Sequence, residues 1–457
     1  MEEEIRMILE RQREFFASGI TLDINYRLGI LKKLRTEILS NEEDLADALW
    51  KDFHKPPQET IGTETRLVLS ELNLVIRKLR KWAVKKRVRT SLVNFPAKSF
   101  IMAQPYGQVL VMSPWNFPFL LSMIPVIGAL AAGNCVILKA SRKAANAIRV
   151  IDKILTALPD TLISMVHGDH SSSDILLYYK FDYIFFTGST SVGSKVMKKA
   201  AENLIPLTLE LGGKSPCVVT HDAKPELAAR RIAWGKFINA GQTCIAPDYL
   251  LIDSRIKDRF LELLIKELNT FYGNNPEESN DYCRIINSAK TTRLASFMMN
   301  GHIVTGGKVD TDACYVAPTI ITDVSPDDPV MSEEIFGPVL PVISYTDFEE
   351  VYKIIERNPK PLAAYIFSES RRLQKEFLQK TQSGTAAVND TVMQIVSSRL
   401  PFGGIGPSGI GRYHGRKSFE TFSNMKSVLH KSTLFEPDIK YPPYTKIKEK
   451  LIKLIMR

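Results

Sequence analysis

The stretch GQVLVM, residues 107–112, decides the fold class, because it is the first of several short apolar runs of strand length. Similar runs follow at Cys135–Leu138, Ile163–Val166 and Tyr183–Phe186, and segments of helix length lie between them. Strands that alternate with helices are typical of a parallel sheet with helices on both faces. The pattern therefore predicts an α/β fold, in which a ligand binds beyond the carboxyl ends of the strands.

The same pattern divides the chain. Before about residue 80, apolar residues recur at spacings of three and four, which predicts helices. A second series begins near Pro206, with strands at Leu207–Glu210 and Pro216–Val219 and a helix at Glu226–Ile238, and continues to about Val388. The length of 457 residues suits two or more domains, so we expect a second α/β domain in this part.

Composition and charge narrow the class of protein. A hydrophobic content of 44% and a charged content of 24% are typical of a soluble globular chain. The net charge of +10 comes without an aromatic-and-basic module, so we expect no nucleic-acid partner. No apolar run is long enough for a membrane span, and the acidic start MEEEIRMILE is unlike a secretory signal. We therefore expect a cytoplasmic protein without an integral membrane anchor.

The five cysteines, Cys135, Cys217, Cys244, Cys283 and Cys314, are few, odd in number and widely spaced. This spacing favours neither a disulfide framework nor a zinc site, and it suits a reducing cytosol. Cys135 and Cys217 lie within apolar strands and are predicted to belong to the core, whereas Cys283 and Cys314 are predicted to be structural. No histidine or second cysteine lies near Cys244, so we expect no metal there.

Three stretches place polar groups after predicted strands. SPWNFP (Ser113–Pro118) holds the Asn116 amide between two prolines, and a rigid amide donor stabilises an oxyanion. LKAS (Leu138–Ser141) ends the next strand with Lys139, which can reach a ribose or phosphate. FTGSTSVG (Phe186–Gly193) opens a helix whose dipole and first amides can receive pyrophosphate. Taken singly, these stretches also fit a proline-rich turn, a surface lysine and a tight glycine turn.

Two further stretches supply a carboxylate and a thiol. LELGGKSP (Leu209–Pro216) places Glu210 at a strand end near apolar neighbours, where a carboxylate with a raised pKa can act as a general base. GQTCIAPD (Gly241–Asp248) supplies Cys244. A thiol is mostly protonated at neutral pH and needs a helix N-terminus, a cation or a base to react. Taken alone, Glu210 could equally be a glutamate in a surface salt bridge, and Cys244 could equally be a small buried residue of the core.

Together these stretches resemble the aldehyde dehydrogenase superfamily, from about Glu10 to about Tyr444. They occur in the family's order and are followed by EEIFGP (residues 333–338) and PFGG (401–404). The ending GRYHGRKSFETFSN (411–424) and the later YPPY (441–444) are similar to the class 3 branch. The resemblance implies a Rossmann-type dinucleotide-binding domain (1–82 and 105–210), an α/β catalytic domain (211–410) and a small β bridging or oligomerisation element (83–104 and 411–457).

The resemblance also implies the reaction, the oxidation of an aldehyde to a carboxylate with NAD or NADP through a cysteine thioester. Cys244 would be the nucleophile, Glu210 would activate water, and the Asn116 amide with the Cys244 backbone N–H would hold the oxyanion. The implied substrates are medium- or long-chain aliphatic or aromatic aldehydes. The implied cofactor-binding residues are Trp115, Lys139, Ser141, Arg142, Gly188, Ser189, Gly193, Glu334 and Phe336.

One residue departs from the family's pattern. NAD-dependent members carry Lys-x-x-Glu after the second strand, whereas this chain has Lys139 followed by Arg142. A guanidinium attracts the 2′-phosphate that a carboxylate repels. We therefore expect NADP to be accepted and favoured; the alternative is that Arg142 points into solvent and NAD binds through Lys139.

The sequence leaves several questions open. A coenzyme A-acylating oxidation, a cysteine esterase without a redox cofactor and a non-catalytic protein would use the same scaffold, although Glu210 speaks against the first. The class 3 resemblance favours a homodimer joined by strand addition at Val88–Gln104 and the C-terminal segment. The tail KIKEKLIKLIMR (Lys446–Arg457) is basic and amphipathic, and could pack on a partner subunit or lie on an anionic membrane surface.

Overall fold

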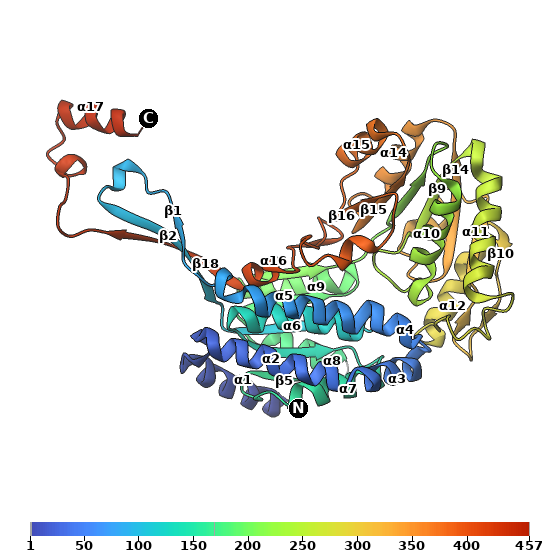
Figure 1. Ribbon diagram of the computed structural model, residues 1–457, viewed down its shortest axis with the longest axis horizontal. Coiled ribbons are helices and arrows are strands. Elements are labelled where there is room, and N and C mark those ends of the chain that lie inside the picture. Colours follow the sequence, from blue (N-terminus) through green and yellow to red (C-terminus); the bar gives the residue numbers. More distant parts are fainter. Residues whose placement is uncertain (1, 169, 457) are drawn as a thin grey trace.

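Two α/β halves and a projecting arm make up the chain, as the computed structural model in Figure 1 shows. The structure describes residues 2–168 and 170–456. Met1, at the start of the predicted cofactor domain, and Arg457, at the end of the predicted tail, lie outside these ranges. The α/β fold predicted from the alternating pattern is confirmed by both sheets.

The first half is built on a six-stranded sheet in the order β17-β7-β6-β3-β4-β5. Five strands are parallel, and only β17 runs antiparallel, against β7. The strands β3, β4 and β6 contain only buried residues, which explains their uninterrupted apolar runs. The bounds are β3 Gln108–Ser113, β4 Cys135–Ala140, β5 Ile163–Met165, β6 Tyr183–Thr187, β7 Leu207–Glu210 and β17 Gly409–Ile410.

Helices cover both faces of this sheet because successive strand residues point to opposite sides. Val109 and Val111 of β3 belong to the core cluster under α6, whereas Leu110 and Met112 belong to the cluster that faces α1, α8 and α9. The helices on the α6 side are α2 Ile24–Ser40, α3 Glu42–Phe53, α5 Arg66–Trp82, α6 Pro118–Ala132 and α7 Ala145–Thr156. Those on the other side are α1 Glu2–Ala17, α8 His170–Tyr178 and α9 Thr190–Glu202.

The second half contains a seven-stranded sheet in the order β10-β13-β14-β9-β8-β15-β16, with only β10 antiparallel to its neighbour. Its strands are β8 Pro216–Val219, β9 Tyr249–Asp253, β10 His302–Thr305, β13 Thr319–Thr322, β14 Val339–Tyr345, β15 Ala363–Phe367 and β16 Thr385–Val388. The helices are α10 Pro225–Phe237, α11 Lys257–Tyr272, α12 Ser288–Phe297, α13 Pro329–Ser332, α14 Phe348–Arg357 and α15 Arg371–Lys380. A two-stranded ribbon, β11 Val309–Asp310 and β12 Tyr315–Val316, completes this half.

The arm is a three-stranded antiparallel sheet that projects from the body (Figure 1). Its strands are β1 Lys86–Val88, β2 Ala97–Pro105 and β18 Ser423–Lys431, with β2 in the middle. The short helix α17, Lys446–Ile455, lies at the far tip together with the 3-10 turns η3 Leu92–Asn94 and η8 Asp438–Lys440. Segments more than 300 residues apart in the chain thus form one element.

The end of the chain returns to the first half before it enters the arm. The β17 strand pairs with β7, and α16, Arg416–Thr421, packs on α6 and α5. The sequence-based boundary at residue 410 coincides with the end of β17, and α16, which follows it, lies against the first half. The strand at Leu207–Glu210, predicted as part of the second series, is β7 of the first sheet. None of the described helices is long and apolar enough to cross a membrane.

Candidate active site

A cleft of about 1020 Å³ opens where the two halves meet. The strand ends of β3, β4, β6 and β7 form one wall, and the segments around Cys244 and Glu334 form the other. Of the twelve residues with predicted catalytic or cofactor roles, this cleft is lined by Asn116, Trp115, Lys139, Ser141, Arg142, Gly188, Ser189, Glu210, Cys244, Glu334 and Phe336. The cleft lies beyond the carboxyl ends of the strands, where the sequence predicts a ligand site.

The segment before Cys244 has an unusual backbone. Asn239, Ala240 and Gly241 have φ values of +53°, +49° and +71°, so three successive residues lie in the left-handed region. At Gly241 a Cβ would meet the Gly337 carbonyl oxygen at 2.3 Å, which only glycine avoids. Such conformations cost about 1–3 kcal/mol each in non-glycine residues and persist only where the surroundings fix them. This backbone directs the thiol into the cleft.

Side-chain amides fix that turn and connect it to Asn116. The Asn239 Nδ2 donates to the Asn116 carbonyl oxygen at 2.9 Å, and the Asn116 Nδ2 donates to the Gln242 carbonyl oxygen at 3.0 Å. Gln242 in turn donates to the Asn239 and Arg284 carbonyls at 3.1 and 3.0 Å. All three amide side chains are buried. The Asn116 amide is therefore held rigidly beside the cysteine loop.

A buried ion pair supports Asn116 from behind. Glu64 lies in a π-helical turn, Ile61–Thr65, and its Oε2 accepts the backbone N–H groups of Phe119 and Leu120 at 2.9 and 3.0 Å. The Lys55 ammonium donates to Glu64 Oε1 at 2.8 Å, and both side chains are fully buried. A carboxylate at a helix N-terminus satisfies free N–H groups and the helix dipole. Glu64 thereby fixes the start of α6, two residues after Asn116.

Glu210 ends β7 and is almost completely buried. Burial raises the pKa of its carboxyl to about 8, although the Gly404 N–H and the charge of Arg412 act in the opposite direction. Its Oε1 has no hydrogen-bond partner among the described residues. A carboxyl with a pKa near neutrality and a free oxygen in a cleft is suited to accept a proton.

A second buried pair joins three of the sequence motifs. The Lys214 ammonium donates to Asp248 Oδ2 and to the carbonyls of Val330 and Glu333, the latter two at 2.9 Å. Asp248 Oδ1 accepts the Ile335 N–H at 3.0 Å. Lys214 belongs to LELGGKSP, Asp248 to GQTCIAPD and Ile335 to EEIFGP. One ion pair therefore holds together the segments that carry Glu210, Cys244 and Glu334.

Glu334 also lies close to the backbone of the cleft. A Cβ on Gly212 would meet Glu334 Oε2 at 2.0 Å, so the first glycine of LELGGKSP makes room for this carboxylate. Burial raises the pKa of Glu334 to about 8, and the charge of Asp248 adds to the shift. Phe336 follows with φ +52° and packs edge-on against Trp115 at 5.6 Å between ring centroids. A bulky residue with positive φ is rare outside functional or strained sites.

Cys244 lies half-buried between these acids. Burial raises its thiol pKa well above the ordinary value, and the charges of Glu334 and Glu210 add to this. The backbone N–H groups of Cys244 and Ile245 favour the thiolate but do not outweigh burial. A reactive thiol needs a cation, a helix N-terminus or a base beside it, and the nearby carboxyl of Glu210 is a candidate for the base.

The other end of the cleft is cationic. Its lining includes Lys139, Arg142, Lys143, Lys195, Lys290 and Arg293. The pKa of Lys290 is lowered by burial, and the charges of Arg293 and Lys143 lower it further, which shows how closely these cations gather. The N-terminus of α9, capped by Ser189, lies at the same end. Cations and a helix N-terminus fit the pyrophosphate of a dinucleotide.

The individual cofactor residues differ in their surroundings. The Lys139 ammonium is buried and donates to the Gly168 carbonyl at 2.9 Å, whereas Arg142 is exposed at the mouth of the cleft. Gly188 follows β6 directly, and its N–H donates to the Glu210 carbonyl at 3.0 Å. Gly193 is buried in the first turn of α9 and is not among the residues that line the cleft, so its cofactor role stays a prediction. A Cβ there would meet Leu211 at 2.6 Å, so this glycine lets the helix pack closely.

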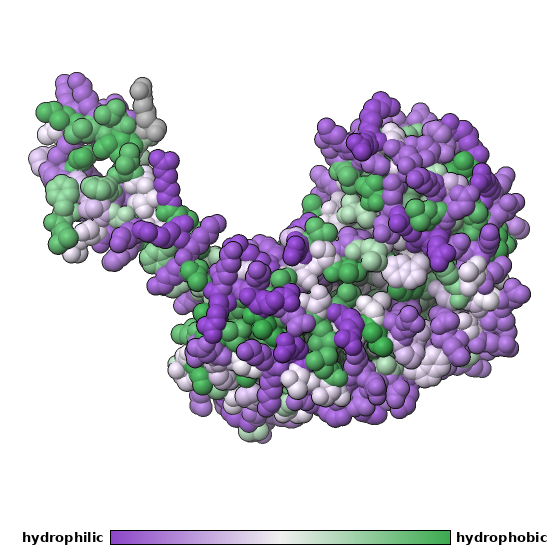
Figure 2. Space-filling view, in the orientation of Figure 1, coloured by the Kyte–Doolittle hydropathy of each residue, from purple (hydrophilic) through white to green (hydrophobic). Residues whose placement is uncertain are grey.

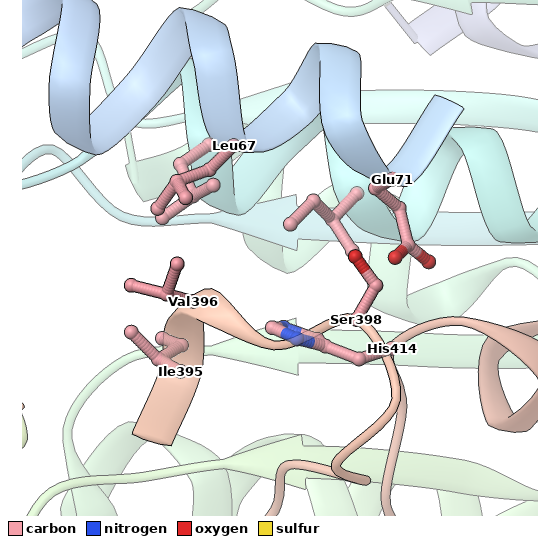
Figure 3. Close-up of a pocket in the computed structure, with 8 residues that line it drawn as sticks. Leu67, Glu71, Ile395, Val396, Ser398 and His414 are labelled. Carbon is pink, nitrogen blue, oxygen red and sulfur yellow. The ribbon is translucent and has the colours of Figure 1, made fainter. Parts of the chain in front are cut away.

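A small cavity adjoins the reacting end, and Figure 3 shows its lining. Leu67 and Glu71 come from α5, and Ile395 and Val396 from the 3-10 turn η7, Met393–Val396; Leu120 and Ile124 of α6 also line it. Ile395 lines both this cavity and the main cleft. The walls are mainly apolar.

The polar end of this cavity holds two buried groups. His414 Nε2 and Glu71 Oε2 have no partner among the described residues. Burial lowers the pKa of His414 to about 4 and raises that of Glu71 to about 7. Sequence reasoning missed both residues, as it missed Glu64, Asn239 and Lys214, because none of them stands out in the sequence as a reactive group. Only the neighbours brought by the fold reveal them.

The structure also shows the surroundings of the four other cysteines. Cys135 and Cys217 are fully buried in β4 and β8, which confirms their assignment to the core. Cys283 is buried and donates to Glu59 Oε1, and Cys314 is half-buried; all five cysteines are free thiols. Within residues 2–168 and 170–456 no three His, Cys, Asp or Glu side chains form a metal-binding group.

A dinucleotide-type sheet that ends at a half-buried thiol and a carboxyl with an unpaired oxygen is typical of a thiol-dependent oxidoreductase. Comparisons with known proteins identify the class: the sequence model of the aldehyde dehydrogenase family matches residues 1–428. The 4,4'-diaponeurosporen-aldehyde dehydrogenase of Staphylococcus aureus is 43% identical, over 97% of each chain. A dimeric NADP-preferring aldehyde dehydrogenase of Rattus norvegicus is 43% identical, over 95% of this chain and 97% of its own.

Solved structures agree. The substrate-bound state of Staphylococcus aureus AldH superposes with a TM-score of 0.97 at 42% identity and covers 99% of both chains. The chain therefore belongs to the aldehyde dehydrogenase family. The predicted resemblance, the fold and the NAD(P)-dependent oxidation of an aldehyde are confirmed by this membership.

Proposed function

We propose that the enzyme oxidises apolar aldehydes to carboxylates through a thioester on Cys244. The observation that carries the proposal is that Asn116, Glu210 and Cys244, from three separate segments, line one buried cleft. They offer a hydrogen-bond donor, a base and a nucleophile, which are the groups that acyl chemistry needs. We also infer that the domains follow the sequence-based division, with residues 211–410 carrying the thiol.

The first step uses the groups around Cys244. Glu210 accepts the thiol proton at its free Oε1, and the thiolate sulfur attacks the aldehyde carbonyl carbon. An amide nitrogen carries two hydrogens, and the Gln242 carbonyl takes only one of those on Asn116, so the other is free for the oxyanion. Together with the Cys244 backbone N–H, it stabilises the developing charge; each such donor contributes about 3 kcal/mol.

The second step releases the acid. A nicotinamide dinucleotide bound in the cleft supplies the acceptor for the two electrons that leave the aldehyde carbon. Glu210 first releases the thiol proton to solvent; it then takes a proton from a water molecule, and the resulting hydroxide attacks the thioester carbonyl. The acid leaves and the Cys244 thiolate returns. Because Glu210 is present with a free oxygen, water rather than coenzyme A is the expected acyl acceptor.

For the cofactor, we propose that NADP is preferred. Arg142 is exposed at the cationic end of the cleft, three residues after Lys139, where it would meet a 2′-phosphate on the adenosine ribose. Ser141, Gly188 and Ser189 would lie along the ribose and pyrophosphate. Glu334 would bind the nicotinamide ribose, while Trp115 and Phe336 would pack nearby. A relative named as NADP-preferring supports the preference.

For the aldehyde, the apolar side chains that line the main cleft support a medium- or long-chain aliphatic or aromatic substrate. Leu121, Ile395 and Phe402 would contact its apolar chain, whereas the cavity of Figure 3, about 10 Å³ in volume, has room for no more than a water molecule. Burial of each methylene contributes about 0.8 kcal/mol, so longer chains should bind more tightly.

We further propose a cytoplasmic homodimer. The outer strand β18 is exposed along most of its length, and an uncovered strand edge pairs readily with another chain. Strand addition at Val88–Gln104 and the C-terminal segment would use this edge, and a relative named as dimeric supports it. Five free thiols, one of them the nucleophile, suit a reducing compartment.

A panel of aldehydes, short to long and aromatic, tests the proposal when it is run with NAD and NADP in parallel and without coenzyme A. Reduced cofactor and free acid should form in equal amounts, and kcat/KM should rise with apolar chain length. Acid that forms only when coenzyme A is present would contradict the hydrolytic role of Glu210. Ester hydrolysis without any cofactor reduction would indicate a cysteine esterase.

A further inference from the structure

Two side chains at the polar end of the cavity in Figure 3 have no role in the mechanism. Glu71 of α5 and His414 are 1% and 4% exposed, and Glu71 Oε2 and His414 Nε2 have no hydrogen-bond partner among the described residues. Most polar side chains of the two halves lie at the surface, as Figure 2 shows. A buried polar atom costs free energy unless a protein group or an ordered water molecule satisfies it. Both atoms therefore need a partner.

The cavity beside these atoms has the size of a single water molecule. Its volume is about 10 Å³, and a buried water needs about 10–15 Å³ and two to four polar partners. In Figure 3, Glu71, Ser398 and His414 lie at one end of the cavity, and apolar side chains such as Leu67 and Ile395 lie at the other. The Ser398 hydroxyl hydrogen-bonds to Glu71 and so opposes the rise in its pKa. The polar end thus offers room and partners for one water molecule.

The hydrogen bonds of such a water molecule balance. Burial lowers the pKa of His414 to about 4, so its ring is neutral near pH 7, and Nε2 is an acceptor when the ring hydrogen is on Nδ1. Glu71 Oε1 accepts the Gly415 N–H at 2.6 Å, which leaves Oε2 for another donor. A water molecule has two hydrogens, and it can donate one to each of the two unpartnered atoms.

His414 connects this site to the wall of the main cleft. Its ring stacks on Phe402, with the centroids 5.6 Å apart and the planes at 29°, and Phe402 lines the cleft. Two backbone hydrogen bonds of 3.0 and 2.8 Å also join Phe402 to Tyr413. His414 itself has φ +78°, a conformation that its surroundings must fix. A link from Glu71 to His414 therefore ties Phe402 to α5.

We propose that one buried water molecule bridges Glu71 Oε2 and His414 Nε2, and that this bridge positions Phe402 against the apolar chain of the aldehyde. Glu71 and His414 are positioning residues, because neither is among the residues that line the main cleft. The part that concerns Phe402 rests on the proposed apolar substrate, whereas the water site does not.

Two other occupants fit less well. A metal ion needs more ligands than one carboxylate oxygen and one ring nitrogen, and no three His, Cys, Asp or Glu side chains form a metal-binding group in the part of the chain that the structure describes. The end of an apolar substrate would leave both polar atoms without a partner. A water molecule satisfies both atoms.

A high-resolution crystal structure of the full-length enzyme tests the water site directly. It should show one water oxygen about 2.7–3.2 Å from both Glu71 Oε2 and His414 Nε2. A crystal of the variant that combines Glu71→Leu with His414→Phe should lack this water. Absence of the water from the parent enzyme, or an ion with further ligands in its place, would overturn the proposal.

Kinetics tests the effect on Phe402. His414→Phe keeps a ring on Phe402 but removes the nitrogen that binds the water, so KM for octanal should rise at least about fivefold, while kcat and KM for NADP stay within about twofold. KM for propanal should change less than about twofold, because this substrate has little apolar chain for Phe402 to contact. A rise in KM that is equal for both aldehydes would show that the pair acts on the whole fold and not through Phe402.

Two further variants serve as controls. Glu71→Gln keeps an oxygen for the Gly415 N–H and a polar atom for the water, so it should leave KM for octanal within about twofold of the parent value. Thr381→Val removes an unpartnered buried hydroxyl in the second half, away from the cleft, and should change none of these constants. Circular dichroism verifies that each variant is folded.

A double-mutant cycle tests whether the two side chains act through one bridge. In a Glu71→Leu background the bridge is already lost, so His414→Phe should raise KM for octanal by less than about twofold. An equal factor in both backgrounds would show that the two side chains act independently, which contradicts the bridge. If the parent enzyme reduces no cofactor with any aldehyde, the proposed function and the role of Phe402 fail together, and the crystal structure still decides the water site.

Discussion

The two ends of the cleft are built differently. At the reacting end, Asn116 and Glu210 are buried, Glu334 is half-buried, and buried hydrogen bonds hold the Asn116 amide. At the cofactor end the groups are mostly long basic side chains, of which Arg142 is exposed. One end is rigidly held and acidic, whereas the other is basic and more exposed.

Because the two ends differ, substitutions at the reacting end should affect the rate of the reaction, and substitutions at the other end should affect the choice of cofactor. Groups that stabilise a transition state must be placed before the substrate arrives, so a substitution among them costs much activity. An exposed guanidinium can reorient at small cost, so a substitution there changes preference more than rate. We therefore expect effects to decrease from Cys244 towards Arg142, and the following variants test this order.

The largest loss is expected for Cys244→Ser. A hydroxyl is a far weaker nucleophile at neutral pH than a thiol with a base beside it, so the reaction loses its covalent step. We expect kcat to fall more than about 10³-fold, while the dissociation constant for NADP changes little. Stopped-flow measurement of reduced cofactor and fluorescence titration of NADP check the two parts. Unaltered turnover would refute the role of the thiol.

Glu210→Gln should come next, with a loss of about 10²- to 10⁴-fold in kcat. The base works as a carboxylate, and since burial raises its pKa to about 8, kcat of the parent enzyme should rise with pH towards that value. In the variant this rise should disappear. Measurement of kcat against pH in both proteins, with an aldehyde in excess, compares them directly.

Glu210→Gln should make the folded protein more stable, although it lowers kcat. A carboxyl whose folded pKa lies above its unfolded value binds more protons in the folded state, so it makes the fold less stable as pH increases from about 4.5 to about 8. Glu210→Gln removes that cost, so the variant should melt at a higher temperature than the parent at pH 8. A lower melting temperature would contradict the burial of an unpaired carboxyl.

Glu64→Gln tests whether the rigid end depends on support from behind. The substitution leaves the buried Lys55 ammonium without its partner, which destabilises a fold by about 3–5 kcal/mol. The double variant with Lys55→Met removes the unpaired charge and should recover most of this stability, as urea unfolding would show. Its kcat should remain about tenfold low, because the start of α6 beside Asn116 loses its charged acceptor.

The kinetic readout separates positioning from general damage. If Glu64 acts only through Asn116, KM for NADP should be that of the parent while kcat falls, and Glu64→Gln should add little to an Asn116→Ala variant. Asn116→Ala alone should cost about 10²- to 10³-fold in kcat. Full kcat in the variant that combines Glu64→Gln with Lys55→Met would show that Glu64 has no part in holding the Asn116 amide.

The sequence predicted much of this arrangement for a physical reason. Apolar runs such as residues 107–112 and 135–138 are buried on both faces, so composition alone identifies them as central strands. Cys244, Glu210 and Asn116 could be identified because they stand in motifs with chemistry of their own. The supporting groups could not, because Glu64, Lys214 and Asn239 act through partners far away in the chain.

Gly193 is a residue that stands in a recognisable motif but whose role the sequence alone cannot determine. A glycine in a strand-to-helix turn fits both an approach to phosphate and close packing of a helix, and the sequence cannot distinguish the two. The structure places Leu211 against it, so packing explains the residue. The arm was similarly ambiguous, since β2 pairs with β18 across more than 300 residues and no local pattern records such a register.

The smallest effect is expected for Arg142→Glu, which tests the exposed, basic end of the cleft. A charged hydrogen bond to a phosphate contributes about 1.5–3 kcal/mol, so kcat/KM for NADP should fall at least about tenfold. The same carboxylate can accept hydrogen bonds from the ribose hydroxyls of NAD, so kcat/KM for NAD should hold or rise. Arg142→Met is the matched control, because it removes the charge without adding an acceptor: it should weaken NADP without improving NAD. Steady-state kinetics with both cofactors measures these effects. If neither variant changes the ratio of kcat/KM for NADP to kcat/KM for NAD, Arg142 lies in solvent and Lys139 holds the ribose alone.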